Sequence, residues 1–137
     1  MKRTSPSELL IRQRLRTLSR ALPAAQKGDS KSLHHARVAT RRLREALPLV
    51  AGGGRGRKLE RSVRRVTRAL GPVRELDVAL MTLDELEAAA DVPRPAITRL
   101  RQVIRKERRS LHAEMRRKLS RLDLDKQIGR ASCRERV

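Results

Sequence analysis

Apolar residues recur at helical spacing through most of the chain, and the pattern is clearest over residues 33–50. One face of this stretch carries residues three or four positions apart, which is the period of an amphipathic helix: Leu33, Ala36, Thr40, Leu43, Leu47 and Val50. Asp29 or Ser30 is predicted to cap the start of this helix by accepting a bond from a free backbone N–H. Pro48 should kink or fray its last turn.

Four further helices are predicted from the same spacing and from helix-start signals. Ser5-Pro6-Ser7-Glu8 predicts a capping box, with a helix that ends near Leu22, before Pro23. The others are predicted at 57–70, 72–90 and 96–122, with a break at 71–72. No stretch has the alternation of a strand, so we expect an all-α, up-down bundle of about five helices.

The polar residues of the 33–50 helix gather on one side. His34, Arg37, Arg41 and Arg44 fall within roughly 80° of a helical wheel, whereas Arg42 points elsewhere. Most charged helix faces are simply solvated. A face with only positive charge, mostly arginine, instead favours an anionic ligand, because the guanidinium fork matches phosphate geometry.

A second basic face is predicted on the 57–70 helix, opposite its apolar side, from Arg57, Arg61, Arg64, Arg65 and Arg68. The next helix is acidic, and we expect Arg74 and Asp77 to form a structural salt bridge across one turn. The glycines at 52–56 resemble a phosphate loop only superficially, because no strand precedes them; we interpret them as a linker.

Composition strengthens the case for a polyanionic partner. The 137 residues hold 35 Lys and Arg against 15 Asp and Glu, a net charge of +20, with no aromatic residue. Nucleic acid, polyphosphate and an anionic membrane surface are the candidates. Readers of single strands and RNA usually stack bases on aromatic side chains, so duplex DNA is the better nucleic-acid candidate. No apolar run reaches about 18 residues and no signal-peptide core is present, so we expect a cytoplasmic protein without a transmembrane segment.

No catalytic motif and no cofactor motif is found in the sequence. His34, His35 and His112 lack metal-ligand spacing with any cysteine or carboxylate. No G-x-S-x-G, Walker or H-E-x-x-H pattern occurs. We therefore expect a non-catalytic binding protein without a metal or cofactor.

Two stretches resemble the signatures of one family. His34-His35-Ala36-Arg37-Val38-Ala39-Thr40-Arg41-Arg42-Leu43-Arg44 resembles H-x-x-R-V-x-x-R-R-L-R, the first signature of the CHAD family, the conserved-histidine α-helical domain. Leu70-Gly71-Pro72-Val73-Arg74-Glu75-Leu76-Asp77-Val78 resembles its L-G-x-x-R-D-L-D-V, with Glu75 in place of the usual Asp.

The resemblance implies an all-helical protein of two similar bundles that binds inorganic polyphosphate in a basic channel, without catalysis. It places His34 in the binding face, and together with the basic helix faces we expect polyphosphate contacts from His34, Arg37, Arg41, Arg42, Arg44, Arg57, Arg61, Arg64, Arg65 and Arg68. Polyphosphate granules are then one expected location. The alternatives are a duplex-DNA-binding helical protein and an accessory region of a CYTH-type triphosphatase, because CHAD domains are often fused to such enzymes.

The last ten residues, IGRASCRERV, are the translation of a sequence that resembles a DNA-sequencing adapter. We therefore expect residues 1–127 to be the N-terminal bundle of a truncated CHAD domain and 128–137 to be a foreign tail. The only cysteine, Cys133, lies in this tail. A missing second bundle should leave Leu111, Met115 and Leu122 exposed and favour self-association.

Overall fold

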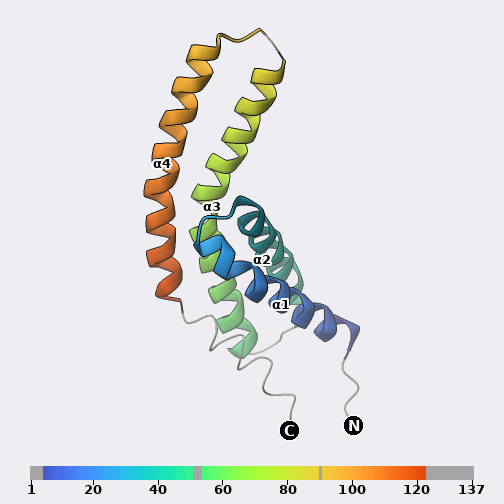
Figure 1. The fold of residues 1–137 in the computed structure, drawn as a ribbon. Helices are drawn as coiled ribbons and strands as arrows, with labels where there is room; N and C mark the ends of the chain where they lie inside the picture. The colour runs from blue at the N-terminus through green and yellow to red at the C-terminus, as the bar shows by residue number, and fades with distance from the viewer. Residues whose placement is uncertain (1–4, 51–53, 90, 123–137) are drawn as a thin grey trace.

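The computed structural model describes residues 5–50, 54–89 and 91–122, and within them it contains four helices and no strand. The helices are α1 (Pro6–Gln26), α2 (Ser30–Val50), α3 (Gly54–Ala88) and α4 (Arg94–Ser120). They run up, down, up and down, and each packs against the next (Figure 1). The all-helical fold is therefore confirmed. The predicted foreign tail and residues 51–53 of the predicted glycine linker lie outside the described residues, whereas Gly54 and Gly56, predicted to belong to the linker, lie in the first turn of α3.

The predicted caps of α1 and α2 are present. The Glu8 backbone N–H donates to Ser5 Oγ at 3.2 Å and the Ser5 N–H donates back to Glu8 Oε2 at 3.4 Å, so the capping box is confirmed. At the start of α2 the Ser32 N–H donates to Asp29 Oδ2 at 2.9 Å, so Asp29 caps this helix. Hydrogen bonds from Ser32 are also the main reason that the pKa of Asp29 is lowered.

The predicted break at Gly71-Pro72 is wrong, since α3 continues through it as one helix of 35 residues. Pro72 cannot donate a backbone hydrogen bond inside the helix, which costs about 3 kcal/mol. Leu70 and Val73 on either side are fully buried, and burial of such side chains contributes about 1.5–3 kcal/mol each. Packing therefore holds the two predicted helices together as one, and the number of described helices is four instead of five.

Pro23 likewise lies inside α1, which ends at Gln26 instead of Leu22. The extra turn places Ala25, which is fully buried, in the core. Pro48 lies inside α2, which runs on to Val50. All three prolines are exposed, so water can reach the carbonyl groups that their rings leave without a helical donor.

One apolar core joins the lower part of the molecule. Its members with no exposed surface are Leu18, Ala25, Leu33, Ala36, Leu43, Val63, Val66, Leu70 and Val73, and α4 adds Met115 and Leu119, at 1 % and 2 % exposed. Two polar side chains within it are satisfied by their own helices, because Thr40 Oγ1 donates to the Arg37 carbonyl at 2.9 Å and Ser62 Oγ donates to the Lys58 carbonyl at 3.0 Å.

The upper halves of α3 and α4 extend beyond α1 and α2 (Figure 1). The reason is length, since α3 has 35 residues whereas α1 and α2 have 21 each. Leu83 and Ile97 are buried there, and Arg101 Nη2 contacts Asp84 Oδ1 and Glu87 Oε2 at 2.7 Å each. Glu87, and then Asp84, raise the pKa of Arg101 above its usual range.

The expected exposure of Leu111, Met115 and Leu122 is wrong. Met115 is 1 % exposed, and the other two are partly buried against the core, because the second half of α4 packs on the bundle. The large apolar residues of α4 that are exposed are instead Leu100 and Val103, at 51 % and 61 %, in the half that extends beyond α1 and α2.

Candidate anion-binding site

Four basic residues follow the exposed side of α2. His34, Arg41 and Arg44 are exposed and Arg37 is half-buried, while Leu33, Ala36, Leu43 and Leu47 on the other side are buried. The separation arises because residues three and four apart share one face of a helix. The predicted basic row on α2 is therefore present beside the contact with α3.

Arg37 reaches across to α3 at a residue that has no side chain. A Cβ atom built on Gly71 would lie 3.1 Å from Arg37 Nη1. The guanidinium of Arg37 thus lies against the backbone of α3, and a larger residue at position 71 would push it away. An alanine at position 71 would require the end of the Arg37 side chain to shift by a few tenths of an ångström.

Arg74 lies near His34, one turn further along α3. Partial desolvation of the imidazole, and then the charges of Arg74 and His35, lower the pKa of His34 below its usual value of 6.5. The structure therefore adds Arg74 to the basic residues beside α2. The sequence-based interpretation assigned Arg74 to a salt bridge and missed this position.

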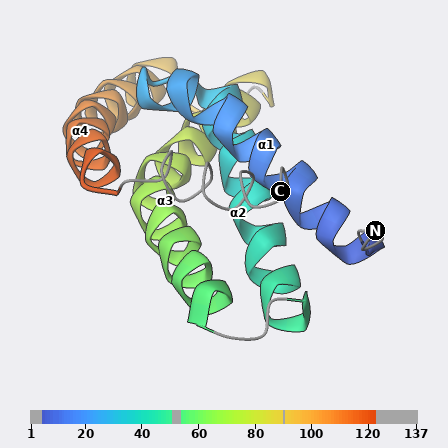
Figure 2. The ribbon, with the colours of Figure 1, turned by 90° about the horizontal axis from the view of Figure 1, so that it is seen from below.

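The two contacts also define how α2 is aligned along the axis of α3. On α2, Arg37 follows His34 by three residues. On α3, their respective neighbours run the other way, because Gly71 precedes Arg74 by three residues, as expected for antiparallel helices. The same register brings Arg44 to the level of Arg64. The two rows of basic residues are therefore expected to run beside each other along the α2–α3 contact. Figure 2 shows the ribbons of these two neighbouring helices from below.

All five predicted arginines of α3 are exposed, but they do not all lie on this side. On a helical wheel Arg57, Arg64 and Arg68 fall within roughly 60° of Gly71, Arg61 lies about 80° away, and Arg65 about 120° away.

On α2, Arg42 is about 140° from Arg37 by the same geometry. Helical geometry, together with the Arg37–Gly71 contact, groups eight residues that we call the α2–α3 basic face: His34, Arg37, Arg41, Arg44, Arg57, Arg64, Arg68 and Arg74. It places Arg42 and Arg65 away from this face and Arg61 at its edge.

Acidic residues near the basic face are weakly held, and they are exposed except for Glu60, whose side chain is 25 % exposed. Arg41 Nε lies 3.5 Å from Glu45 Oε1, with the two side chains 81 % and 68 % exposed, and Arg64 Nη2 lies 3.3 Å from Glu60 Oε1. Glu75 is exposed on the same side of α3. Exposed pairs of this kind contribute only about 0–1 kcal/mol, so a stronger anion can replace the carboxylates.

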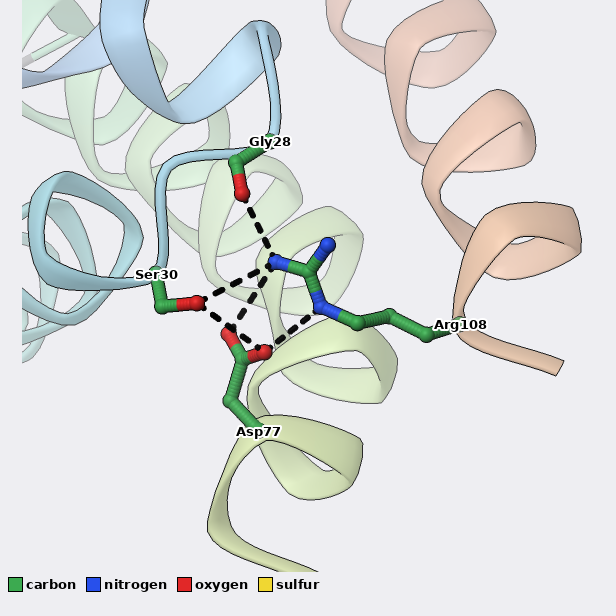
Figure 3. A network of polar contacts seen from close by, with 4 residues as sticks. All are labelled: Gly28, Ser30, Asp77 and Arg108. Atoms are coloured by element: carbon green, nitrogen blue, oxygen red, sulfur yellow. Dashed lines mark hydrogen bonds and ion pairs between the residues drawn. The ribbon is translucent and has the colours of Figure 1, made fainter. Parts of the chain in front are cut away.

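Asp77 is paired with Arg108 of α4, which corrects the predicted pairing with Arg74. Arg108 Nε donates to Asp77 Oδ1 at 2.6 Å, and Arg108 Nη2 donates to the Gly28 carbonyl at 2.8 Å. Ser30 Oγ also donates to Asp77 Oδ1, at 3.3 Å (Figure 3). Gly28 has φ of +99°, a conformation that favours glycine, and this turn points its carbonyl toward Arg108.

This network fixes the start of α2 against α3 and α4. Asp77 is buried, with 4 % of its side chain exposed, and Arg108 is 18 % exposed. Ser30 lies one turn before His34, and Asp77 lies one turn after Arg74. The buried Asp77–Arg108 pair therefore fixes the alignment of α2 along α3 near His34 and Arg74, although neither Asp77 nor Arg108 belongs to the basic face.

The part of the chain that the structure describes contains no group of three His, Cys, Asp or Glu residues able to hold a metal ion. None of its helices is long and apolar enough to cross a membrane. The chemistry that the α2–α3 basic face offers is a row of guanidinium donors and one imidazole, which suits an extended anion.

Comparison with known proteins gives one match. The family model of the CHAD domain matches residues 9–130, which includes the first three residues of the predicted foreign tail. No curated protein and no solved structure matches the chain. Because the family match spans most of the sequence and contains both signature stretches, the chain belongs to the CHAD domain family.

Proposed function

We propose that this protein binds inorganic polyphosphate along the α2–α3 basic face, without catalysing a reaction. The observation that supports the proposal is the close approach of Arg37 of α2 to Gly71 of α3, with exposed arginines on both helices beside it. CHAD domains are linked to polyphosphate binding in general, and this chain has the CHAD domain.

The geometry favours a linear phosphate chain because the donors are arranged in a line. Successive turns of α2 present His34, Arg37, Arg41 and Arg44, and each turn rises by about 5.4 Å. Charge-assisted bonds from arginine to phosphate oxygens are short and strong. A phosphate chain lying along α2 therefore meets a new donor at each turn, and the α3 row supplies donors from the other side.

The chain has no aromatic residue, which separates this proposal from single-stranded nucleic-acid binding. Recognition of single strands depends largely on stacking of bases against aromatic rings. Duplex DNA offers only its phosphates to this surface, at a lower charge density than polyphosphate. Arg42 and Arg65 are proposed to contribute to the overall positive field and not to direct contacts, because they point away from the face.

Competition between long-chain polyphosphate and duplex DNA tests this proposal. At equal phosphate concentration and physiological salt, polyphosphate should displace labelled DNA from the protein. By analogy with DNA binders that make 6–10 phosphate contacts, affinity should fall by about 10³–10⁵ between 50 and 200 mM salt. Tighter binding of DNA would overturn the polyphosphate assignment in favour of the duplex alternative.

Binding should strengthen at lower pH because His34 gains a proton when the anion arrives. In the free protein the pKa of His34 lies below 6.5, so the imidazole is neutral near pH 7. A bound phosphate stabilises the charged form and raises this pKa. Isothermal titration should show tighter binding at about pH 5.5 than at about pH 7.5, and His34→Gln should flatten this dependence.

His35→Gln is the matched control, because His35 lies about 100° from His34 on the helix and should keep most of the pH dependence. Folding stability in the absence of polyphosphate should depend on pH in the opposite direction from binding. Since the folded-state pKa of His34 lies below the unfolded value, the unfolded chain binds the proton more readily, and stability should fall as pH drops through 6.5. An unchanged pH dependence in His34→Gln would remove His34 from the proposed contacts.

A further inference from the structure

A cavity of about 620 Å³ lies between the end of α1 and the second half of α4. It is lined by Pro23, Gln26, Lys27, Ala113, Arg116, Arg117 and Ser120. The α4 residues are three and four positions apart, so they form one face of the helix turned toward α1. The volume falls within the range of about 300–1,000 Å³ that is typical of small-molecule sites.

Among the lining residues that the structure describes, three are cations and none is an acid. Lys27 comes from α1, and Arg116 and Arg117 come from α4, so positive charge faces the cavity from both walls. Glu114 is the acidic residue next to this stretch of α4, and its Oε1 lies 3.1 Å from Lys118 Nζ, which does not line the cavity. The described walls of this solvent-open cavity thus carry an excess of positive charge.

The cavity walls are held by hydrogen bonds of their own. His112 Nε2 lies 2.8 Å from the Gln26 carbonyl, which joins α4 to the end of α1. The backbone N–H of Lys27 donates to carbonyls of the last turn of α1, and Ser120 Oγ donates to the Arg117 carbonyl at 2.8 Å. The two walls are therefore joined beside the cavity, and the cations are presented from fixed backbone.

This cavity is separate from the α2–α3 basic face. Asp77 and Asp84 contact α4, and on a helical wheel they lie roughly 120–160° around α3 from Gly71 and Arg64. Helix α4 thus lies on the side of α3 away from the basic face. Figure 2 shows the same arrangement, with α2 and α4 on opposite sides of α3.

We propose that the α1–α4 cavity is a second anion site that takes the triphosphate group of a small molecule. Three cations balance most of the negative charge of a triphosphate group, and paired arginines bind phosphate oxygens well. Pro23 and Ala113 leave the remaining wall apolar, with space beside the charges. The source of the group is either an organic triphosphate or a short inorganic chain, since both offer the same oxygens.

The test measures binding of two probes, adenosine triphosphate without magnesium and inorganic tripolyphosphate, to the full chain at physiological salt. Saturable binding of either probe should weaken by about tenfold or more in the variant Arg116→Gln/Arg117→Gln, because two charge-assisted contacts are removed. Lys27→Gln, from the opposite wall, should weaken the same probe. The probe that binds more tightly identifies the source of the triphosphate group.

Arg105→Gln/Arg109→Gln is the matched control, because both residues are exposed on α4, neither lines the cavity, and the charge change is equal. It should alter probe affinity by less than about threefold, as expected for screened charges. Arg37→Glu/Arg41→Glu should leave probe binding in place even where long-chain polyphosphate no longer binds. Equal losses in both α4 variants, or no saturable binding of either probe, would overturn the proposal.

Discussion

Replacing both Arg37 and Arg41 by glutamate should remove polyphosphate binding while leaving the helices folded. Each change replaces a donor on the α2–α3 basic face with a charge that repels phosphate. Hydrogen bonds to charged groups contribute about 1.5–3 kcal/mol each, so loss of two should reduce affinity by about 100-fold or more. Arg41 is exposed and Arg37 is half-buried over Gly71, so neither change leaves a cavity in the core.

The matched control is Arg42→Glu/Arg65→Glu, which changes the net charge by the same amount. Both residues are exposed and point away from the basic face. If binding depends on the face, this variant should lose less than about tenfold, an effect of the overall field alone. Equal losses of affinity in the two double variants would show that binding depends on the net charge and not on the position of the arginines. A large fall in helical circular dichroism in Arg37→Glu/Arg41→Glu would show a structural role instead.

Replacing Arg108 by methionine should have the largest effect on stability. It leaves the Asp77 carboxylate, with 4 % of its side chain exposed, without its cation, and it removes the bond to the Gly28 carbonyl. Removing one partner of a buried ion pair costs about 3–5 kcal/mol, because the remaining charge is uncompensated. The free energy of unfolding in urea measures this loss.

Two comparisons sharpen that measurement. Lys118→Met removes a cation from α4 whose pair with Glu114 is about half exposed, and it should cost about 0.3–0.5 kcal/mol. The double variant Asp77→Leu/Arg108→Met should recover much of the stability, since it leaves no unpaired buried charge. Equal destabilisation by Arg108→Met and Lys118→Met would show that the Asp77 pair does not fix the bundle.

The same network has a consequence for binding. Ser30 and Asp77 lie one turn away from His34 and Arg74, so loosening them lets α2 shift along α3. The alignment of the two rows of basic residues depends on the position of α2 along α3. A folded Arg108 variant should therefore bind polyphosphate more weakly than the parent chain, although Arg108 is not a contact.

Local chemistry determined much of this protein from sequence alone. The Ser5–Glu8 capping box, the Asp29 cap and the apolar face of α2 depend on neighbours within one or two turns, and the structure contains all of them. The all-helical class follows from the same short-range periodicity. The basic row on α2 could also be read in this way, because its members share one helix.

Tertiary structure decided what depends on packing between helices. Pro72 predicts a break by its local chemistry, but burial of Leu70 and Val73 on a common core keeps α3 continuous. Leu100 has the spacing of a core residue, yet it is exposed because α3 and α4 extend beyond the other helices there.

Asp77 shows the same limit for charged residues. The i, i+3 spacing favours Arg74 as its partner, but Arg108 lies 31 residues away and reaches it inside the bundle, where an unpaired carboxylate would be most costly. Arg74 is thereby left beside His34 and joins the basic face. Helical periodicity therefore determined which residues share a face, whereas the level and packing of the helices decided which faces meet.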